Sequence, residues 1–128
     1  VYKRQAHSQN YEDIVIPQGT DTAIELHLVK ESDGSPFDLT NYSAEAKMKR
    51  RHGDSANDPN TVTFNAIIPT PATAGIVTLS LSSDSSQGLN TRGRYVWDCE
   101  VSFVDSDSKT IVQRVAEGQA EISPSVTY

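Results

Sequence analysis

The stretch that most constrains the fold is residues 93–104, GRYVWDCEVSFV. Apolar residues occupy every second position from Tyr95 to Phe103, and three of the four residues between them are polar. A period of two sends successive side chains to opposite faces of a sheet, and aromatic residues suit a half-buried pleated surface. The sequence therefore predicts a long central strand on which Tyr95, Trp97 and Phe103 anchor the core.

The same alternation recurs in shorter segments separated by turn signals. It is clearest in residues 22–29, where Ile24, Leu26 and Leu28 share one face. Residues 43–50 contain good helix formers, but their apolar period of two favours a strand. Further strands are predicted at residues 14–16, 61–68, 76–81, 109–115 and 119–122, with a helical turn capped by Ser83 within residues 82–90 and a bulge or bend at Glu117 and Gly118. Seven or eight short strands predict an antiparallel two-sheet sandwich or a small barrel.

The length of 128 residues suits one domain with a core of its own. Residues 1–13 are polar or lack a pattern over most of their length, so we expect a flexible N-terminal arm that orders only against a neighbour. Residues 14–128 are expected to form the single β-sandwich domain. One Cys excludes an internal disulfide, so apolar packing must hold the fold.

Net charge excludes some classes of partner. The formal charge of -6 and the pI near 4.9 argue against general binding of nucleic acid or acidic lipid. No apolar run approaches the roughly 20 residues that a membrane-spanning helix needs. We therefore expect neither a nucleic-acid partner nor a membrane partner.

Residues with catalytic or metal-binding potential do not form a recognisable set. Cys99 lies on the apolar side of its strand and is expected to be a buried thiol rather than a nucleophile. His7, His27 and His52 lack the spacing of zinc ligands. Residues 105–108, DSDS, lack the glycine and the distal glutamate of a calcium loop and are interpreted as a hairpin turn. We expect no catalytic residues, no metal and no cofactor, and hence no enzyme.

One basic cluster is the candidate docking surface. On a strand, Lys47, Lys49 and Arg51 would share one face. Such a patch can dock the acidic face of an identical neighbour or another anionic surface. Alternatively, the lysines keep an edge strand soluble and unpaired. The residues alone leave both interpretations open.

Several phrases in succession resemble a known group of proteins. Residues 18–21 (QGTD), 33–42 (DGSPFDLTNY), 76–81 (IVTLSL), 93–100 (GRYVWDCE) and 114–127 (RVAEGQAEISPSVT) follow one another in the order found in small β-sandwich structural domains of tailed bacteriophages. The resemblance spans roughly residues 14–127, and no functional residues are carried over. It implies a virion component without a catalytic role.

These observations together lead to one expectation and one alternative. The chain is expected to be an all-β, antiparallel, two-sheet immunoglobulin-like sandwich that acts as an assembly module of a phage tail, baseplate or neck. Its partners would be other phage structural proteins and further copies of itself, and its location the virion, after synthesis in the host cytoplasm. The alternative is a carbohydrate- or host-receptor-binding module, in which the rings of Tyr42, Tyr95 and Trp97 are the candidates for stacking on a sugar.

Overall fold

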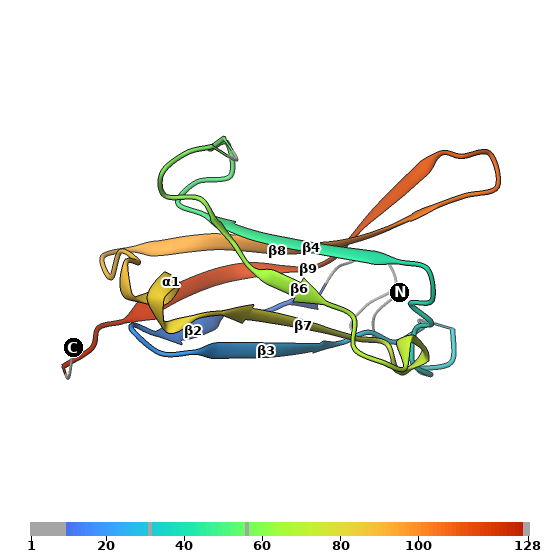
Figure 1. Cartoon of the computed structure of the whole chain (residues 1–128), viewed down its shortest axis with the longest axis horizontal. Coiled ribbons are helices and arrows are strands. Elements are labelled where there is room, and N and C mark those ends of the chain that lie inside the picture. The colour runs from blue at the N-terminus through green and yellow to red at the C-terminus, as the bar shows by residue number, and fades with distance from the viewer. Residues whose placement is uncertain (1–9, 31, 56, 127–128) are drawn as a thin grey trace.

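The computed structural model describes residues 10–30, 32–55 and 57–126, and this part of the chain is nearly all β-structure (Figure 1). Nine strands are present in it, with one 3-10 turn, η1 (Ala72–Ala74), and one short helix, α1 (Ser83–Gln87). The strands are β1 (Asn10–Tyr11), β2 (Ile14–Pro17), β3 (Thr22–His27), β4 (Ser43–Lys49), β5 (Val62–Thr63), β6 (Asn65–Ile67), β7 (Ile76–Leu81), β8 (Arg94–Val104) and β9 (Thr110–Ser123).

The strands form two sheets. The large sheet has the order β1-β9-β8-β4-β5, with β2 also paired to β9, and the small sheet has the order β3-β7-β6. All pairs are antiparallel except those of β1 and β2 with β9, which are parallel. Between β5 and β6 the chain passes from one sheet to the other at Phe64, whose side chain is buried. The predicted fold class is confirmed, because the strands pair as in a two-sheet immunoglobulin-like sandwich. In that arrangement, the second, fifth and fourth strands form one sheet, as β3, β7 and β6 do here. The third, sixth and seventh strands form the other, as β4, β8 and β9 do here.

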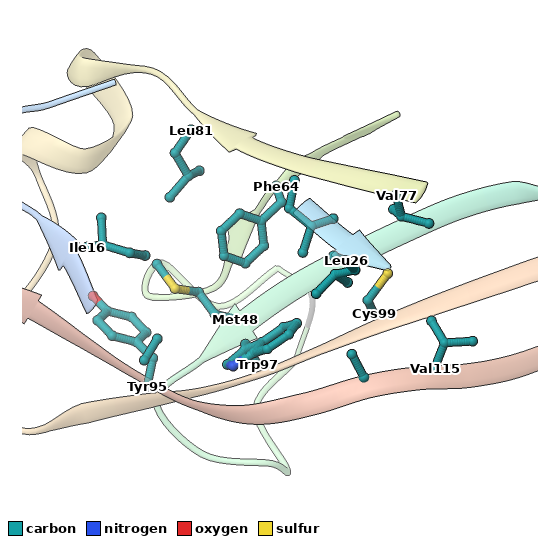
Figure 2. Close-up of a cluster of buried hydrophobic side chains, with 14 of the residues drawn as sticks. Ile16, Leu26, Met48, Phe64, Val77, Leu81, Tyr95, Trp97, Cys99 and Val115 are labelled. Carbon is teal, nitrogen blue, oxygen red and sulfur yellow. The ribbon is translucent and has the colours of Figure 1, made fainter. Parts of the chain in front are cut away.

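The core lies between the inner faces of the two sheets (Figure 2). Tyr95 and Trp97 are 2% and 3% exposed, as the alternation in β8 predicts. Each large apolar side chain buried in this way contributes about 1.5–3 kcal/mol relative to an exposed one. Other members of the cluster come from every part of the sandwich and include Ile16, Leu26, Met48, Phe64, Val77, Leu81, Cys99 and Val115.

The prediction of Phe103 as a third core anchor is wrong. Its side chain is only partly buried and packs against the ring of Tyr42, with ring centroids 5.0 Å apart. Figure 1 shows why: the end of the β8–β9 hairpin extends beyond the small sheet. The alternation sets the face on which Phe103 lies, but it does not specify whether another sheet lies opposite.

The boundary of the predicted N-terminal arm also differs from the structure. Asn10 and Tyr11 form β1 and pair with Ala116 and Glu117 of β9. The Glu12 backbone N–H then donates to the Glu117 carbonyl at 2.8 Å. Asn10 and Tyr11 therefore belong to the large sheet and Glu12 is bonded to it, while residues 1–9 of the expected arm lie outside the described residues.

The last two predicted strands are one continuous strand, β9. Its irregularity is not at Gly118 but earlier, because Cys99 pairs with Ala116 and Glu100 pairs with Arg114, which leaves Val115 as the extra residue. Two successive residues of β9, Val115 and Ala116, are consequently both buried. The bulge thus lets the side-chain alternation of β9 restart in the correct phase.

The helical turn is present, with its cap one residue earlier than predicted. The Ser82 hydroxyl accepts the Ser85 backbone N–H at 3.2 Å, so Ser82 and not Ser83 is the N-cap. Ser86 is buried and donates its hydroxyl to the Thr20 carbonyl at 2.7 Å. Together with buried Leu89, this contact ties α1 to the turn between β2 and β3.

Candidate docking surface

The outward side chains of the three central strands of the large sheet form a charged outer face. It consists of Glu45, Lys47 and Lys49 on β4, Asp98 and Glu100 on β8, and Arg114 and Glu117 on β9. These residues alternate with the buried ones because the period of a strand is two. In the register of the sheet they form rows, and Lys47, Asp98 and Glu117 lie side by side in the middle row.

Beneath this face, Trp97 of β8 reaches across β9 to the link between β1 and β2. In the pairing of β8 with β9, Trp97 lies opposite Gly118. The indole extends over this glycine, and its Nε1–H donates to the Glu12 carbonyl on the far side of β9 at 2.9 Å. A β-carbon at Gly118 would meet both the Glu12 carbonyl and the indole nitrogen. Because residue 118 is a glycine, the indole can cross β9 and bond the link between β1 and β2. This bond helps to keep β1 and β2 paired with β9 at the edge of the sheet that carries the charged outer face.

Several of the charges pair within the face. Lys47 pairs with Glu45, and the Arg114 guanidinium lies 3.5 Å from Asp98 and 3.7 Å from Glu117. Because both partners of the Arg114 pairs are about a third to a half exposed, each pair contributes at most about 1 kcal/mol. These contacts orient the side chains more than they stabilise the fold.

Not every charge on the face is balanced in this way. Glu45 lies directly opposite Glu100, an arrangement of like charges that is unfavourable between paired strands. In the described part of the chain, neither Glu100 nor Lys49 forms an ion pair. The face also contains a groove of about 230 Å³, lined by Glu45 and Glu100 among its acidic residues and by Lys49 and His52 among its basic ones.

The sequence-predicted basic surface is only partly assembled. Lys47 and Lys49 lie on the charged outer face, but Arg51 does not, because β4 ends at Lys49. The Arg51 backbone N–H instead donates to the Asp54 carboxylate at 3.2 Å in the following turn. Arg50 folds back, with its guanidinium 5.0 Å from the centre of the Tyr95 ring.

The acidic members of the face and Arg114 were missed as parts of one site. The sequence places Asp98 and Glu100 on the polar side of β8, which is a signal for exposure. Which strands flank β8 depends on long-range pairing, and the sequence pattern does not specify that pairing. The charged side chains form one site only because β4 and β9 pair with β8 on its two sides.

The thiol of Cys99 is not available as a nucleophile. Burial, and to a smaller extent the carboxylates of Asp98 and Glu100, together raise its pKa to about 12. A thiol attacks as its thiolate, so Cys99 is chemically inert at neutral pH. Its placement agrees with the interpretation as a small buried residue.

Within the described residues, no group of three or more His, Cys, Asp or Glu side chains could hold a metal ion. His27 contacts Glu25 at 3.1 Å on β3, His52 lies in the turn after β4, and His7 falls outside the described residues. The Asp105 carboxylate accepts the backbone N–H groups of Asp107 and Lys109, each at 2.9 Å, as a turn-capping residue does. Among the same residues, none of the helices has the length and apolarity that a membrane span requires.

The rings considered for sugar stacking are not free on the surface. Tyr95 and Trp97 are buried, and the Tyr95 hydroxyl accepts the Asn90 backbone N–H at 3.0 Å. Tyr42 is half-buried between Phe37 and Phe103. None of the three offers a flat exposed face to a sugar ring.

The fold and the face define a class: an immunoglobulin-like β-sandwich with a charged, grooved sheet face. No family model and no curated protein matches the chain. Among solved structures it is similar to murine CRIg, with 16% sequence identity, a TM-score of 0.49, and coverage of 90% of this chain and 95% of that one. It is also similar to AggA, the major subunit of aggregative adherence fimbriae type I from Escherichia coli, with 9% identity, a TM-score of 0.38, and coverage of 93% and 100%. At these values neither protein's role is transferred to this chain.

Proposed function

We propose that this chain is a non-catalytic structural component of a tailed-phage particle and that it acts by protein–protein docking in the tail, baseplate or neck. The succession of sequence motifs across residues 14–127 supports the assignment to a virion. The observation that most supports docking is the charged outer face, where Glu100 and Lys49 have no ion-pair partner in the described residues beside a groove of about 230 Å³.

A docking partner would complete the charge pattern of this face. A cationic side chain placed near Glu45 and Glu100 would relieve their like-charge contact, and an anionic one near Lys49 and His52 would complement the basic lining. Charges arranged in this way set the orientation of a partner and disfavour wrong partners more than they add affinity. That is the requirement of a component that must be placed in one orientation in a symmetric particle.

The first test is whether the chain is in the particle and whether the face is covered there. Mass spectrometry of purified particles should detect the chain. Lysine acetylation of intact particles should then label Lys47 and Lys49 less than in the isolated chain, while Lys109, in the turn of the projecting hairpin, serves as the exposed control. Absence of the chain from particles would refute the proposal, and equal labelling of both lysines in the two samples would refute docking by this face.

A charge reversal sharpens the second part of this test. Glu100→Lys should lower incorporation of the chain into particles, because it changes the sign of an unpaired charge at the groove. Asp107→Lys makes the same change in the hairpin turn and should leave incorporation unchanged. Equal incorporation of the two variants would contradict the assignment of the face.

A further inference from the structure

The small sheet has an open edge at β3. β3 pairs with β7 from Thr22 to His27, and within the described residues no strand pairs with its other side. In the immunoglobulin arrangement the first strand lies beside the second strand at this edge. Here β1 and β2 both pair with β9 of the large sheet instead. A row of backbone donors and acceptors on β3 is therefore left for another strand.

The direction of these groups follows from the hydrogen bonds of the strand. Leu28 N–H donates to the Gly75 carbonyl at 2.8 Å on the β7 side. Because the direction of the backbone N–H and C=O groups alternates along a strand, these groups point to β7 in the even-numbered residues of β3. Ala23, Glu25 and His27 consequently direct their N–H and C=O groups to the open edge. β3 contains neither the proline nor the bulge that protects many edge strands.

The side chains of this edge discriminate between possible registers for a second copy. Glu25 and His27 are about 60% exposed and contact each other at 3.1 Å within the strand. If two copies pair antiparallel about a two-fold axis at Leu26, Glu25 of each copy lies opposite His27 of the other. An axis at Glu25 would place two carboxylates opposite each other, and an axis at His27 would place two imidazoles opposite each other.

The register centred on Leu26 also matches the faces of the strands. Glu25 and His27 are both residues whose backbone groups point to the open edge, so they form hydrogen-bonded pairs across the axis. On the inner side, Leu26 lies opposite its own counterpart, and Ile24 lies opposite Leu28. The pairing of a carboxylate with an imidazole, the backbone direction and the apolar pairing therefore agree in the arrangement centred on Leu26.

We infer that β3 is the surface through which two copies of this chain associate, as antiparallel strands centred on Leu26. The three strands of each small sheet then form one continuous sheet across the two copies. This inference rests on the proposed assembly role, because it identifies one docking partner as a second copy of the chain. It concerns the opposite sheet from the charged outer face, so the two surfaces can be tested separately.

The test is sedimentation equilibrium of the full chain over a wide range of concentrations. A monomer–dimer equilibrium is expected. Glu25→Lys should raise the dissociation constant by about tenfold, because both cross-strand pairs lose the carboxylate that accepts from the imidazole and gain an ammonium group in its place. The double variant Glu25→Lys/His27→Glu restores opposite charges in the same register and should recover most of the affinity. Asp107→Lys, the same change of charge in the hairpin turn, should leave the dissociation constant unchanged.

A second variant tests the backbone contact directly. Ala23→Pro removes one N–H that points to the open edge and leaves the pairing with β7 intact, and an edge strand tolerates proline at such a position. It should weaken the dimer without altering the circular dichroism of the monomer. If this variant does not fold, the dissociation constants of Glu25→Lys and Glu25→Lys/His27→Glu test the inference alone.

Two results would overturn the inference: a monomer at every concentration, or a dimer that neither Glu25→Lys nor Ala23→Pro weakens. In either case the protection of Lys47 and Lys49 in particles would be unaffected, so failure here is distinguishable from failure of the proposed function.

Discussion

The edges of the two sheets differ on the side where the N-terminal strands lie. In the large sheet, β9 is covered by β1 and β2, whereas in the small sheet β3 has no strand on its outer side within the described residues. The covered edge has a specific holding contact, the hydrogen bond from the Trp97 indole to the Glu12 carbonyl. β3 offers no equivalent buried donor. One indole and one glycine thus favour the pairing of the N-terminal strands with the large sheet.

The energetic basis of this difference is the cost of leaving a buried donor unpaired. An indole N–H that is buried without an acceptor costs about 1–3 kcal/mol. Trp97 avoids this cost only while the Glu12 carbonyl lies beyond Gly118.

The largest effect is expected from filling the space above Gly118. Gly118→Ala places a methyl group against the Glu12 carbonyl and the indole nitrogen, so the free energy of unfolding should fall by about 3 kcal/mol. Urea denaturation measures this change. Gly53→Ala is the matched control, since nothing lies within 4 Å of the added atom, and it should change stability by less than about 0.5 kcal/mol. Equal effects of the two variants would show that the covered edge does not depend on Gly118.

Removing the indole donor should have the next largest effect. Trp97→Phe loses the hydrogen bond to Glu12 and leaves a small void, at a cost of about 2 kcal/mol. Amide exchange should accelerate in residues 10–17 more than in β3. Tyr95→Phe is the control: it loses only the bond from the Asn90 N–H, about 1 kcal/mol, and should leave exchange in residues 10–17 close to wild type. Uniform acceleration across both sheets would argue against a local role for the indole.

A pH titration reports on the burial of Cys99, which β8 of the large sheet places in the core. The unfolded thiol ionises near pH 9, whereas burial raises the pKa of the folded thiol to about 12. Above pH 9 the unfolded state therefore loses its proton first, and stability falls as the pH rises towards 12. At pH 10 the loss should be about 1.4 kcal/mol relative to neutral pH. Measured by urea denaturation, Cys99→Ala should lack this component; identical pH profiles would show that the thiol is not buried in solution.

The smallest effect is expected on the charged outer face. Arg114→Gln removes the contacts to Asp98 and Glu117, but all three side chains are a third to a half exposed to solvent, so the free energy of unfolding should fall by about 0.5 kcal/mol or less. The difference should vanish at high salt, where exposed pairs are screened. A salt-independent loss above about 1 kcal/mol would mean that this face stabilises the fold rather than serving a partner.

Local patterns predicted most of the strands and the position of the core. The alternation at Tyr95 and Trp97, and at Leu26 and Leu28, indicated their buried faces because a strand's period is a local property. The predictions fail where the burial or pairing of a residue depends on a second segment of the chain. Phe103 has the correct phase but extends beyond the small sheet, and residues 10–12 have no alternation because their place is set by β9 and Trp97.

The candidate site was predictable only in part for the same reason. Lys47 and Lys49 were assigned to an exposed face from the alternation in β4, and both lie there. The prediction for Arg51 extends the strand two residues too far, into the turn that Asp54 closes. Arg114 and Glu117 join the face through the register of β9, which depends on an extra residue at Val115 that the sequence does not mark.

The parallel pairing of β2 with β9 has a mechanical consequence. Because the two strands run in the same direction, a pull applied between residues 10 and 126 would slide β2 and β9 past each other along their lengths. The backbone bonds from Ile14 to Pro17 would then be strained together, in shear, and none could open before the others. An element loaded in this way resists force far better than a hairpin that unzips one bond at a time.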